Sequence, residues 1–262
     1  MTTTPHLPRP LSRRRLLGAC ALAFAASTFA APPAMAWSWG GGEQVKGNGN
    51  IKTEARQLGH FNGVAMSLPG TVEVRSGGSE GVSIETDDNL LPLIETVVED
   101  GTLKIRSKNR VNIQSRNLKI IVQAREIEHL ALGGTGSIDA DRVHGTRVHV
   151  DLGGSGTIRV GKAEAESLSV SLGGSGGLKV DEGSARSLSV AIGGSGKVDM
   201  PRVRVEKASV SVGGSGDATL WVRDSLSLSV AGSGDVNYYG DPQVSKSVAG
   251  SGTAHRLGAA PR

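Results

Sequence analysis

The stretch SLSVSLGGSG, residues 167–176, decides the fold, because its glycine-rich end recurs at a fixed interval along the chain. Between the second residues of successive copies, the steps in residue number are 20, 20, 20, 20, 18 and 18. The copies are Gly133–Gly136, Gly153–Gly156, Gly173–Gly176, Gly193–Gly196, Gly213–Gly216, Ala231–Gly234 and Ala249–Gly252. A fixed period of this size predicts stacked structural repeats. Because the motif occurs seven times, any chemistry proposed for one copy must also explain the others.

Apolar and polar residues alternate on both sides of each glycine turn. In the third copy, Leu168, Val170 and Leu172 stand six, four and two positions before the second glycine. Leu178 and Val180 stand four and six positions after it, and a weaker stretch of small residues follows. This alternation with a period of two is typical of a strand with one buried face.

We therefore expect an all-β chain in which each unit is one coil of a right-handed parallel β-helix. A coil would hold two clear strands, a glycine corner and a shorter third side, with about 4.8 Å between coils. The aromatic content of 3% suits a narrow core of Val, Leu, Ile and Ala. Glycine at the corner would permit positive φ and close approach of neighbouring backbones. A β-meander or a sandwich is the competing fold, but neither normally keeps such a period in register over five units.

Residues 1–36 have the pattern of an export signal rather than of a folded domain. Arg13 and Arg14 resemble the pair of a twin-arginine signal, and an apolar stretch follows them. The sequence Ala34-Met35-Ala36 is typical of a cleavage site, so we expect cleavage after Ala36. An alternative is lipidation of Cys20, because residues 17–20 approximate a lipobox, but cleavage there would leave the apolar stretch on the mature chain.

Removal of this segment changes both the charge and the cysteine content of the chain. The full sequence has 29 basic and 25 acidic residues, and the segment contains four arginines and no acid. The mature chain would therefore be neutral, with 25 residues of each sign, which argues against nucleic acid as a partner. The single cysteine, Cys20, would also be lost, so we expect neither a disulfide nor a thiol nucleophile.

Composition and spacing divide the rest of the chain into four segments. Residues 37–50 are expected to be a flexible Gly- and Asn-rich lead-in, 51–130 an irregular β region, 131–256 the regular coils, and 257–262 a tail. Lys246 and Arg256 stand where the inward columns are otherwise apolar, as expected at the end of a solenoid that avoids edge pairing. The mature chain has no apolar run long enough to cross a bilayer.

Several motifs together resemble one bacterial family. They are Arg56, Phe61 and Gly63-Val64, then Asp88–Leu91 and Asp100–Ile105, then the Leu-x-Gly-Gly-Ser-Gly turns, and then Tyr239–Pro242. Over roughly residues 47–255 the chain resembles the DUF2807 family, the putative auto-transporter adhesin, head GIN domain. The resemblance implies an exported β-helix-like domain of the cell envelope, and its motifs carry no catalytic residue.

Three features invite a chemical interpretation that the repeat argues against. Gly173–Gly177 matches the G-x-S-x-G nucleophile elbow, which requires a following helix and acid and histidine partners. Asp217 and Asp235 follow glycine corners, but two carboxylates without further oxygen ligands make a weak calcium site. His129 and His149 share an outward column, with Asp151 as a candidate third metal ligand. We therefore expect no catalytic residue, no metal and no cofactor.

The polar face of the strands before the turns is the best candidate interaction surface. Its serines would form a flat, weakly charged sheet of hydroxyls that could meet a glycan, another sheet or an envelope protein. They are Ser169, Ser171, Ser189, Ser209, Ser211, Ser227 and Ser229. An ordinary solvated strand face would have the same pattern.

These features together predict an exported, non-enzymatic module of the cell envelope, in the periplasm or at the cell surface. It would act as an adhesin or surface-interaction module, with a glycan or an envelope protein as its partner. The alternative is a carbohydrate-active β-helix enzyme or a glycan-binding protein. An enzyme would need clustered acids and bases, and the outward column that could supply them is Asp139, Arg159, Lys179 and Asp199. Ion pairs between coils would produce the same mixture of charges.

Overall fold

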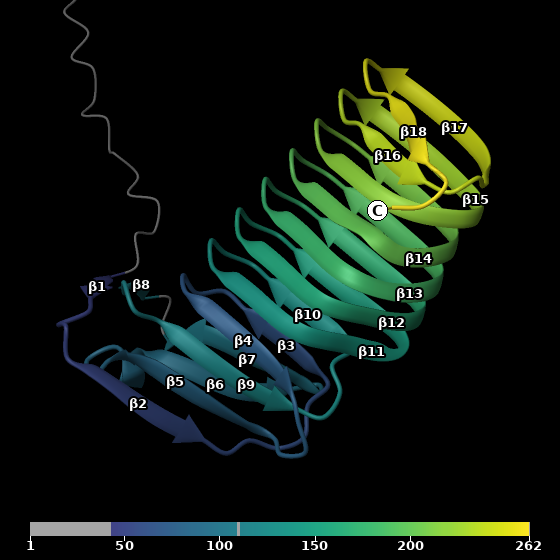
Figure 1. Ribbon diagram of the computed structural model, residues 1–262. Helices are drawn as coiled ribbons and strands as arrows, with labels where there is room; N and C mark the ends of the chain where they lie inside the picture. Colours follow the sequence, from purple (N-terminus) through teal and green to yellow (C-terminus); the bar gives the residue numbers. More distant parts are fainter. Residues whose placement is uncertain (1–42, 109–110, 262) are drawn as a thin grey trace, which may run out of the picture. The chain divides into compact units, whose positions relative to one another are not determined.

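The computed structural model describes residues 43–108 and 111–261, and nearly all of its elements are β-strands (Figure 1). Five strands of 16 residues each are separated by the glycine turns. They are β11 (Ser137–Leu152), β12 (Thr157–Leu172), β13 (Gly177–Ile192), β14 (Lys197–Val212) and β15 (Asp217–Gly232). Each pairs in parallel with the next, so that Ile138 lies opposite Ile158 and Ile158 opposite Leu178. The predicted β-solenoid with coils of roughly 20 residues is confirmed.

The inward columns of the coils form one continuous hydrophobic core. In β12, Ile158, Val160, Leu168, Val170 and Leu172 are at most 2% exposed. The polar residues Arg159, Ser169 and Ser171 alternate with them. The same columns are buried from β10 (His129–Leu132) to β15. Each apolar side chain therefore stacks on its equivalents above and below, and burial of this kind contributes about 25 cal/mol per Å² of apolar surface.

The third side of each coil, expected as a shorter and weaker stretch of small residues, is continuous with the strands on either side of it. It stays in the parallel ladder, with Val143 opposite Ala163, Ala163 opposite Gly183 and Gly183 opposite Val203. One long strand therefore runs from corner to corner, because adjacent coils satisfy its backbone N–H and C=O groups. Between β14 and β15 the register shifts near Arg204, where the sequence period also becomes shorter.

Close approach of backbones, and not positive φ, explains the second glycine of the regular corners from Gly154 to Gly214. A Cβ at Gly174 would lie 2.9 Å from the carbonyl carbon of Gly154 and closer still to its oxygen. At Gly173, one position earlier, the nearest atom would be 4.0 Å away. Neither glycine has a φ in the left-handed region, so the expectation of positive φ is wrong for this corner.

The two trimmed corners complete this explanation. Alanine occupies their first position, as Ala231 and Ala249, which agrees with the space beside Gly173. Their second residues, Gly232 and Gly250, have φ of 148° and 135°. Positive φ is thus a feature of the trimmed corners, where the chain turns with a shorter coil.

Residues 63–76 form a coil that stacks directly against the coil of the first glycine turn, although residues 77–128 separate the two in the sequence. β3 (Gly63–Met66) pairs with β10, and β4 (Thr71–Ser76) pairs with β11, both in parallel. Five further strands continue these two ladders, namely β7 (Thr102–Ser107) and β6 (Ile94–Glu99) beyond β3, and β9 (Lys119–Ala124), β5 (Gly81–Asp87) and β2 (Ile51–Arg56) beyond β4. A 3-10 helix, η1 (Leu91–Leu93), joins β5 to β6.

The C-terminal coil is interrupted at residues 240–242, which separate β16 (Val236–Tyr239) from β17 (Gln243–Gly250). β17 pairs with β15, and β18 (Ala254–Gly258) pairs with β16. Within the described residues no strand pairs with the far side of β17 or β18. The stack therefore ends in two open strands, drawn in yellow in Figure 1.

At the other end of the sequence, β1 (Gln44–Lys46) pairs in parallel with β8 (Asn112–Gln114). The expected export signal, with Arg13, Arg14, Cys20 and the cleavage site after Ala36, lies outside the described residues. In residues 43–108 and 111–261, no helix has both the length and the apolar character of a membrane-spanning helix.

Candidate functional site

The predicted serines form two straight columns on the outward side of adjacent coils. In the first column, Ser169 lies opposite Ser189, Ser189 opposite Ser209, and Ser209 opposite Ser227. The second column contains, in order, Ser171, Ala191, Ser211 and Ser229. Ser169 is half-buried, and the other predicted serines are exposed. All seven predicted serines therefore lie on one face of the solenoid.

The structure extends both columns by one coil that the sequence interpretation missed. Ser227 lies opposite Ser245, and Ser229 lies opposite Ser247, both of them exposed on β17. Their spacing was available in the sequence, since each follows its neighbour by the shortened period of the last two steps. We call the seven predicted serines together with Ser245 and Ser247 the serine face.

The serine face is a regular array of groups that can each donate and accept a hydrogen bond. Equivalent hydroxyls on adjacent coils are about 4.8 Å apart, the spacing of neighbouring strands. Neither column contains a charged side chain between Ser169 and Ser247. The face therefore suits a neutral polar partner and offers no group for acid–base chemistry.

A cluster of two histidines and an aspartate lies at the N-terminal end of the two serine columns. His129 lies opposite His149 in the register, and His149 lies opposite Ser169. The Nε2 atom of His129 is 3.0 Å from Oδ2 of Asp151, and all three side chains line a depression of about 710 Å³. Among the described residues, no three His, Cys, Asp or Glu side chains are placed to hold one metal ion. The cluster is a hydrogen-bonded pair beside a second histidine.

Asp217 and Asp235 act as hydrogen-bond acceptors between the shortened coils. The backbone N–H of Asp235 donates to Oδ1 of Asp217 over 3.1 Å. Oδ1 of Asp235 in turn accepts the backbone N–H of Thr253 over 3.0 Å and also the Thr253 hydroxyl. Each carboxylate therefore satisfies a donor of the following coil, which accounts for acids at these corners without a cation.

These contacts predict that Thr253→Val raises the pKa of Asp235. The Thr253 hydroxyl, and after it the Thr253 backbone N–H, holds the pKa of this carboxyl below its usual value. Because the folded-state pKa is the lower one, the carboxylate stabilises the fold above the unfolded-state value of about 3.9. That contribution is lost as the pH falls through the folded-state pKa. Titration of the carboxyl carbon by NMR measures the change, and an unchanged pKa in the variant would contradict the assigned contact.

The structure bears on two features that invited a catalytic interpretation, the G-x-S-x-G match at Gly173–Gly177 and the charged outward column. Ser175 is exposed at its corner, and β13 follows it where a nucleophile elbow would require a helix. Asp139 lies opposite Arg159, which lies opposite Lys179, so the charged column is in register as expected. Lys179 in turn lies opposite Asp199.

The charged column borders an open depression of about 510 Å³ lined by several acids. Asp139, Asp141, Asp181 and Glu73 contribute carboxylates to it. The ammonium of Lys119, followed by the guanidinium of Arg75, holds the pKa of Glu73 below its usual range through hydrogen bonds. A general acid at neutral pH requires the opposite change, a raised pKa, so Glu73 is not suited to that role.

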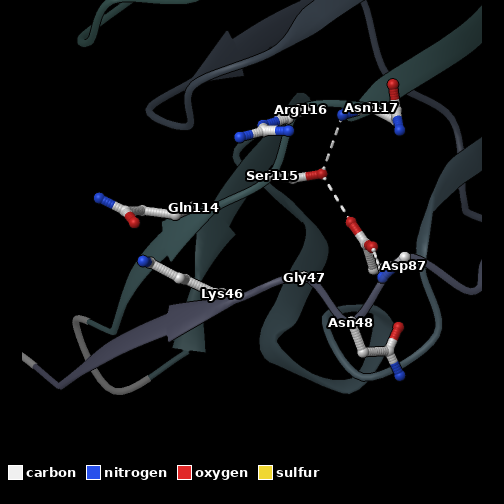
Figure 2. A pocket seen from close by; sticks show the side chains of 9 residues that line it. Lys46, Gly47, Asn48, Asp87, Gln114, Ser115, Arg116 and Asn117 are labelled. Atoms are coloured by element: carbon white, nitrogen blue, oxygen red, sulfur yellow. Dashed lines mark hydrogen bonds between the residues drawn. The ribbon is translucent and has the colours of Figure 1, made fainter.

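A third hollow, of about 630 Å³, surrounds a buried carboxylate near the start of the described chain (Figure 2). Asp87 is 4% exposed, and its two oxygens accept the backbone N–H of Gly49 over 2.6 Å and the Ser115 hydroxyl over 2.9 Å. Lys46 and Arg116 stand at the rim of this hollow. Because a buried acceptor of this kind fixes its donors, Asp87 holds residues 47–49 against β5 and the residues after β8.

We expect Asp87→Ala to lower the free energy of unfolding by about 1–3 kcal/mol, because it leaves two donors without their acceptor. Asp88→Ala is the matched control, since Asp88 is exposed and its carboxylate accepts, among the described residues, only from the side-chain amide of Asn48. Urea denaturation measures both changes, and limited proteolysis should cut the Asp87 variant first near residues 47–50. Equal stability of the two variants would contradict the anchoring role.

Comparison with known proteins places these features in a family. Residues 60–242 match the family DUF2807, described as "Putative auto-transporter adhesin, head GIN domain". The chain belongs to this family. The match lies within the range that the sequence motifs suggested. No curated protein matches the chain.

Solved structures of related proteins share the solenoid. A putative adhesin from Bacteroides fragilis is 21% identical, with a TM-score of 0.75 over 81% of this chain and 100% of that one. A protein from Parabacteroides distasonis described as a putative lipid binding protein is 25% identical, with a TM-score of 0.67 over 82% and 100% of the two chains. A putative adhesin from Parabacteroides merdae is 20% identical, with a TM-score of 0.64 over 82% and 99%. The adhesin structures bear on the fold alone.

Proposed function

We propose that this member of the DUF2807 family is an exported, non-enzymatic module of the cell envelope that binds a glycan through its serine face. The observation that carries the proposal is the register of the hydroxyls, which repeat over adjacent coils from Ser169 to Ser247. The adhesin-like family supports a role in surface contacts. An envelope protein is the other partner class that the face could accept.

The chemistry of serine suits a polyhydroxylated ligand. Each hydroxyl can turn to donate to or accept from a sugar hydroxyl, and a short side chain loses little conformational entropy when it is fixed. Individual hydrogen bonds of this kind contribute only about 0.5–1.5 kcal/mol. Binding therefore depends on many coils acting together, and a chain with repeated hydroxyls would gain from multivalency along the stack.

The alternative function is a carbohydrate-active enzyme acting at the acid-lined depression beside Asp139. Two carboxylates with separated pKa values are the usual requirement for glycoside hydrolysis. The depression supplies carboxylates, but Glu73, the member with a shifted pKa, is shifted toward the ionised form. This observation favours the binding function.

A glycan array followed by a release assay separates the two functions. The proposal predicts that the mature protein binds particular glycans on the array and releases no reducing sugar from them. Turnover of a bound glycan would overturn the non-enzymatic assignment. If turnover occurred, Asp139→Asn together with Asp141→Asn would show whether the acid-lined depression is responsible.

Export can be tested separately in the full-length chain. Replacing Arg13→Lys and Arg14→Lys should stop export and leave the precursor inside the cell, because twin-arginine signals depend on that pair. Cell fractionation measures the result, and it also distinguishes the periplasm from the cell surface. Unchanged export of the variant would contradict a twin-arginine signal.

A further inference from the structure

The C-terminal end of the solenoid exposes residues of columns that are buried in every preceding coil. Leu226 and Val230 of β15 are each 1% exposed. Their partners on β17, Val244 and Val248, are 39% and 40% exposed. The inward side of the last coil is therefore left uncovered by the described chain, and its apolar surface remains in contact with water.

The same end also presents unpaired backbone. All eight residues of β17 are exposed, and within the described residues its only strand partner is β15. The N–H and C=O groups on its far side form a template to which another extended chain can hydrogen-bond. The same strand therefore presents both exposed apolar side chains and backbone groups that lack a strand partner among the described residues.

A lysine interrupts the apolar inward column of the last coil. Lys246 stands between Val244 and Val248 in the inward alternation and lies opposite Leu228 of β15. No described carboxylate lies in ion-pair contact with Lys246. Arg256 of β18, which lies opposite Tyr238, donates from Nε to the carbonyl of Gly240 over 2.7 Å.

The position of Lys246 disfavours a second copy of this chain as the occupant. In a two-fold antiparallel pair of β17 strands centred on Lys246, Val244 of one copy would face Val248 of the other. Lys246 would then face its own equivalent, and like charges directly opposite are destabilising. Lys246 therefore disfavours this pairing between two copies of the chain but leaves the edge of β17 open to another partner.

We propose that β17 is a docking strand for an extended segment of a partner protein whose inward residues read apolar, acidic, apolar. The segment would add to the stack as one more strand, hydrogen-bonded to the far edge of β17. Its apolar residues would cover Val244 and Val248, and its carboxylate would pair with Lys246. β17 also carries Ser245 and Ser247 of the serine face, but the docking contacts use its inward side chains and its far backbone edge, so the proposal does not depend on glycan binding.

The test uses two fluorescent peptides that copy residues 243–250, one unchanged and one carrying Lys246→Glu. Each is titrated against the mature protein and against the protein carrying Lys246→Glu, and anisotropy reports binding. We expect the glutamate peptide to bind the unchanged protein about tenfold more tightly than the lysine peptide. On the variant protein the order should reverse. The reversal is a readout that loss of folding cannot produce.

Backbone pairing is tested by N-methylation of the glutamate peptide. Methylation of the amides that face β17 should abolish binding, whereas methylation of the alternate amides should leave it unchanged. The proposal is overturned if neither peptide binds, if both bind equally, or if both methylation patterns have the same effect. Vesicles of phosphatidylglycerol that bind the protein through Lys246 without any peptide preference would instead identify a lipid surface. Sedimentation of the unchanged protein as an end-to-end dimer would also overturn it.

Discussion

Gly174→Ala is expected to destabilise the solenoid by about 3 kcal/mol, a large part of the total stability of a typical domain. The added methyl group would lie 2.9 Å from the carbonyl carbon of Gly154 and closer to its oxygen, and both atoms belong to the backbone of the preceding coil. Relief of this overlap requires the two coils to separate. Since the coils are hydrogen-bonded on all sides, the separation would break ladder contacts well beyond the corner.

Gly173→Ala is the matched control, with the same chemical change one residue away. Its methyl group would find its nearest neighbour at 4.0 Å, an ordinary contact distance, and neither glycine has a left-handed φ. We expect the control to fold with stability close to that of the unchanged protein, because alanine also restricts the unfolded chain. Urea denaturation monitored by circular dichroism compares the two. Equal losses in both variants would show that backbone approach does not determine the corner sequence.

Val190→Lys is expected to cost more than about 4 kcal/mol and to leave little or no folded protein. Val190 is 1% exposed and stacks between Val170 and Val210 in the inward column. Its replacement by lysine would place an ammonium group in an apolar core with no carboxylate in the column to pair with it. The cost of burying an unpaired charge is among the largest that a single substitution can impose.

Ser189→Lys is the control for this substitution, because the preceding residue points outward. Ser189 is exposed, so its lysine variant should unfold at nearly the same urea concentration as the unchanged protein. The pair also tests the register, since a shift by one residue would exchange the two faces. The solenoid assignment would be wrong if Ser189→Lys proved the more damaging of the two.

Much of the fold could be predicted because the repeat leaves few alternatives. Leu168, Val170 and Leu172 recur with their equivalents at a fixed period, so the same residues must face inward in every coil. The outward serines follow from the same alternation, and the structure places them in register. Ser245 and Ser247 could have been included by adding one more step of the shortened period.

Other features depend on contacts between residues that are far apart in the sequence. The coil formed by β3 and β4 lacks a Gly-Gly corner, and residues 77–128 separate it from its neighbour in the stack. The spacing of six residues from Met66 to Val72 equals that from Leu132 to Ile138, a signal too short to stand out alone. Asp87 likewise has no local motif, because its donors Gly49 and Ser115 come from distant segments.

The corner glycines show that one sequence pattern can have two physical causes. Glycine permits both positive φ and close backbone approach, and the sequence does not distinguish between these two uses. Alanine at the first position of the trimmed corners was the available clue that this position has space. From Gly154 onward, the second position requires glycine because the preceding coil leaves no room for a Cβ.

Glycan binding by the serine face is tested most directly by one comparison of two doubly substituted proteins. The first carries Ser189→Lys and Ser209→Lys, which place two charges within one serine column. The second carries Ser184→Lys and Ser195→Lys, two exposed positions outside both columns, and so has the same net charge. Binding of each to the glycan selected on the array is measured against the unchanged protein by biolayer interferometry. We predict that the first variant loses binding and the second retains it, whereas equal binding by the two variants would contradict glycan binding through the serine face.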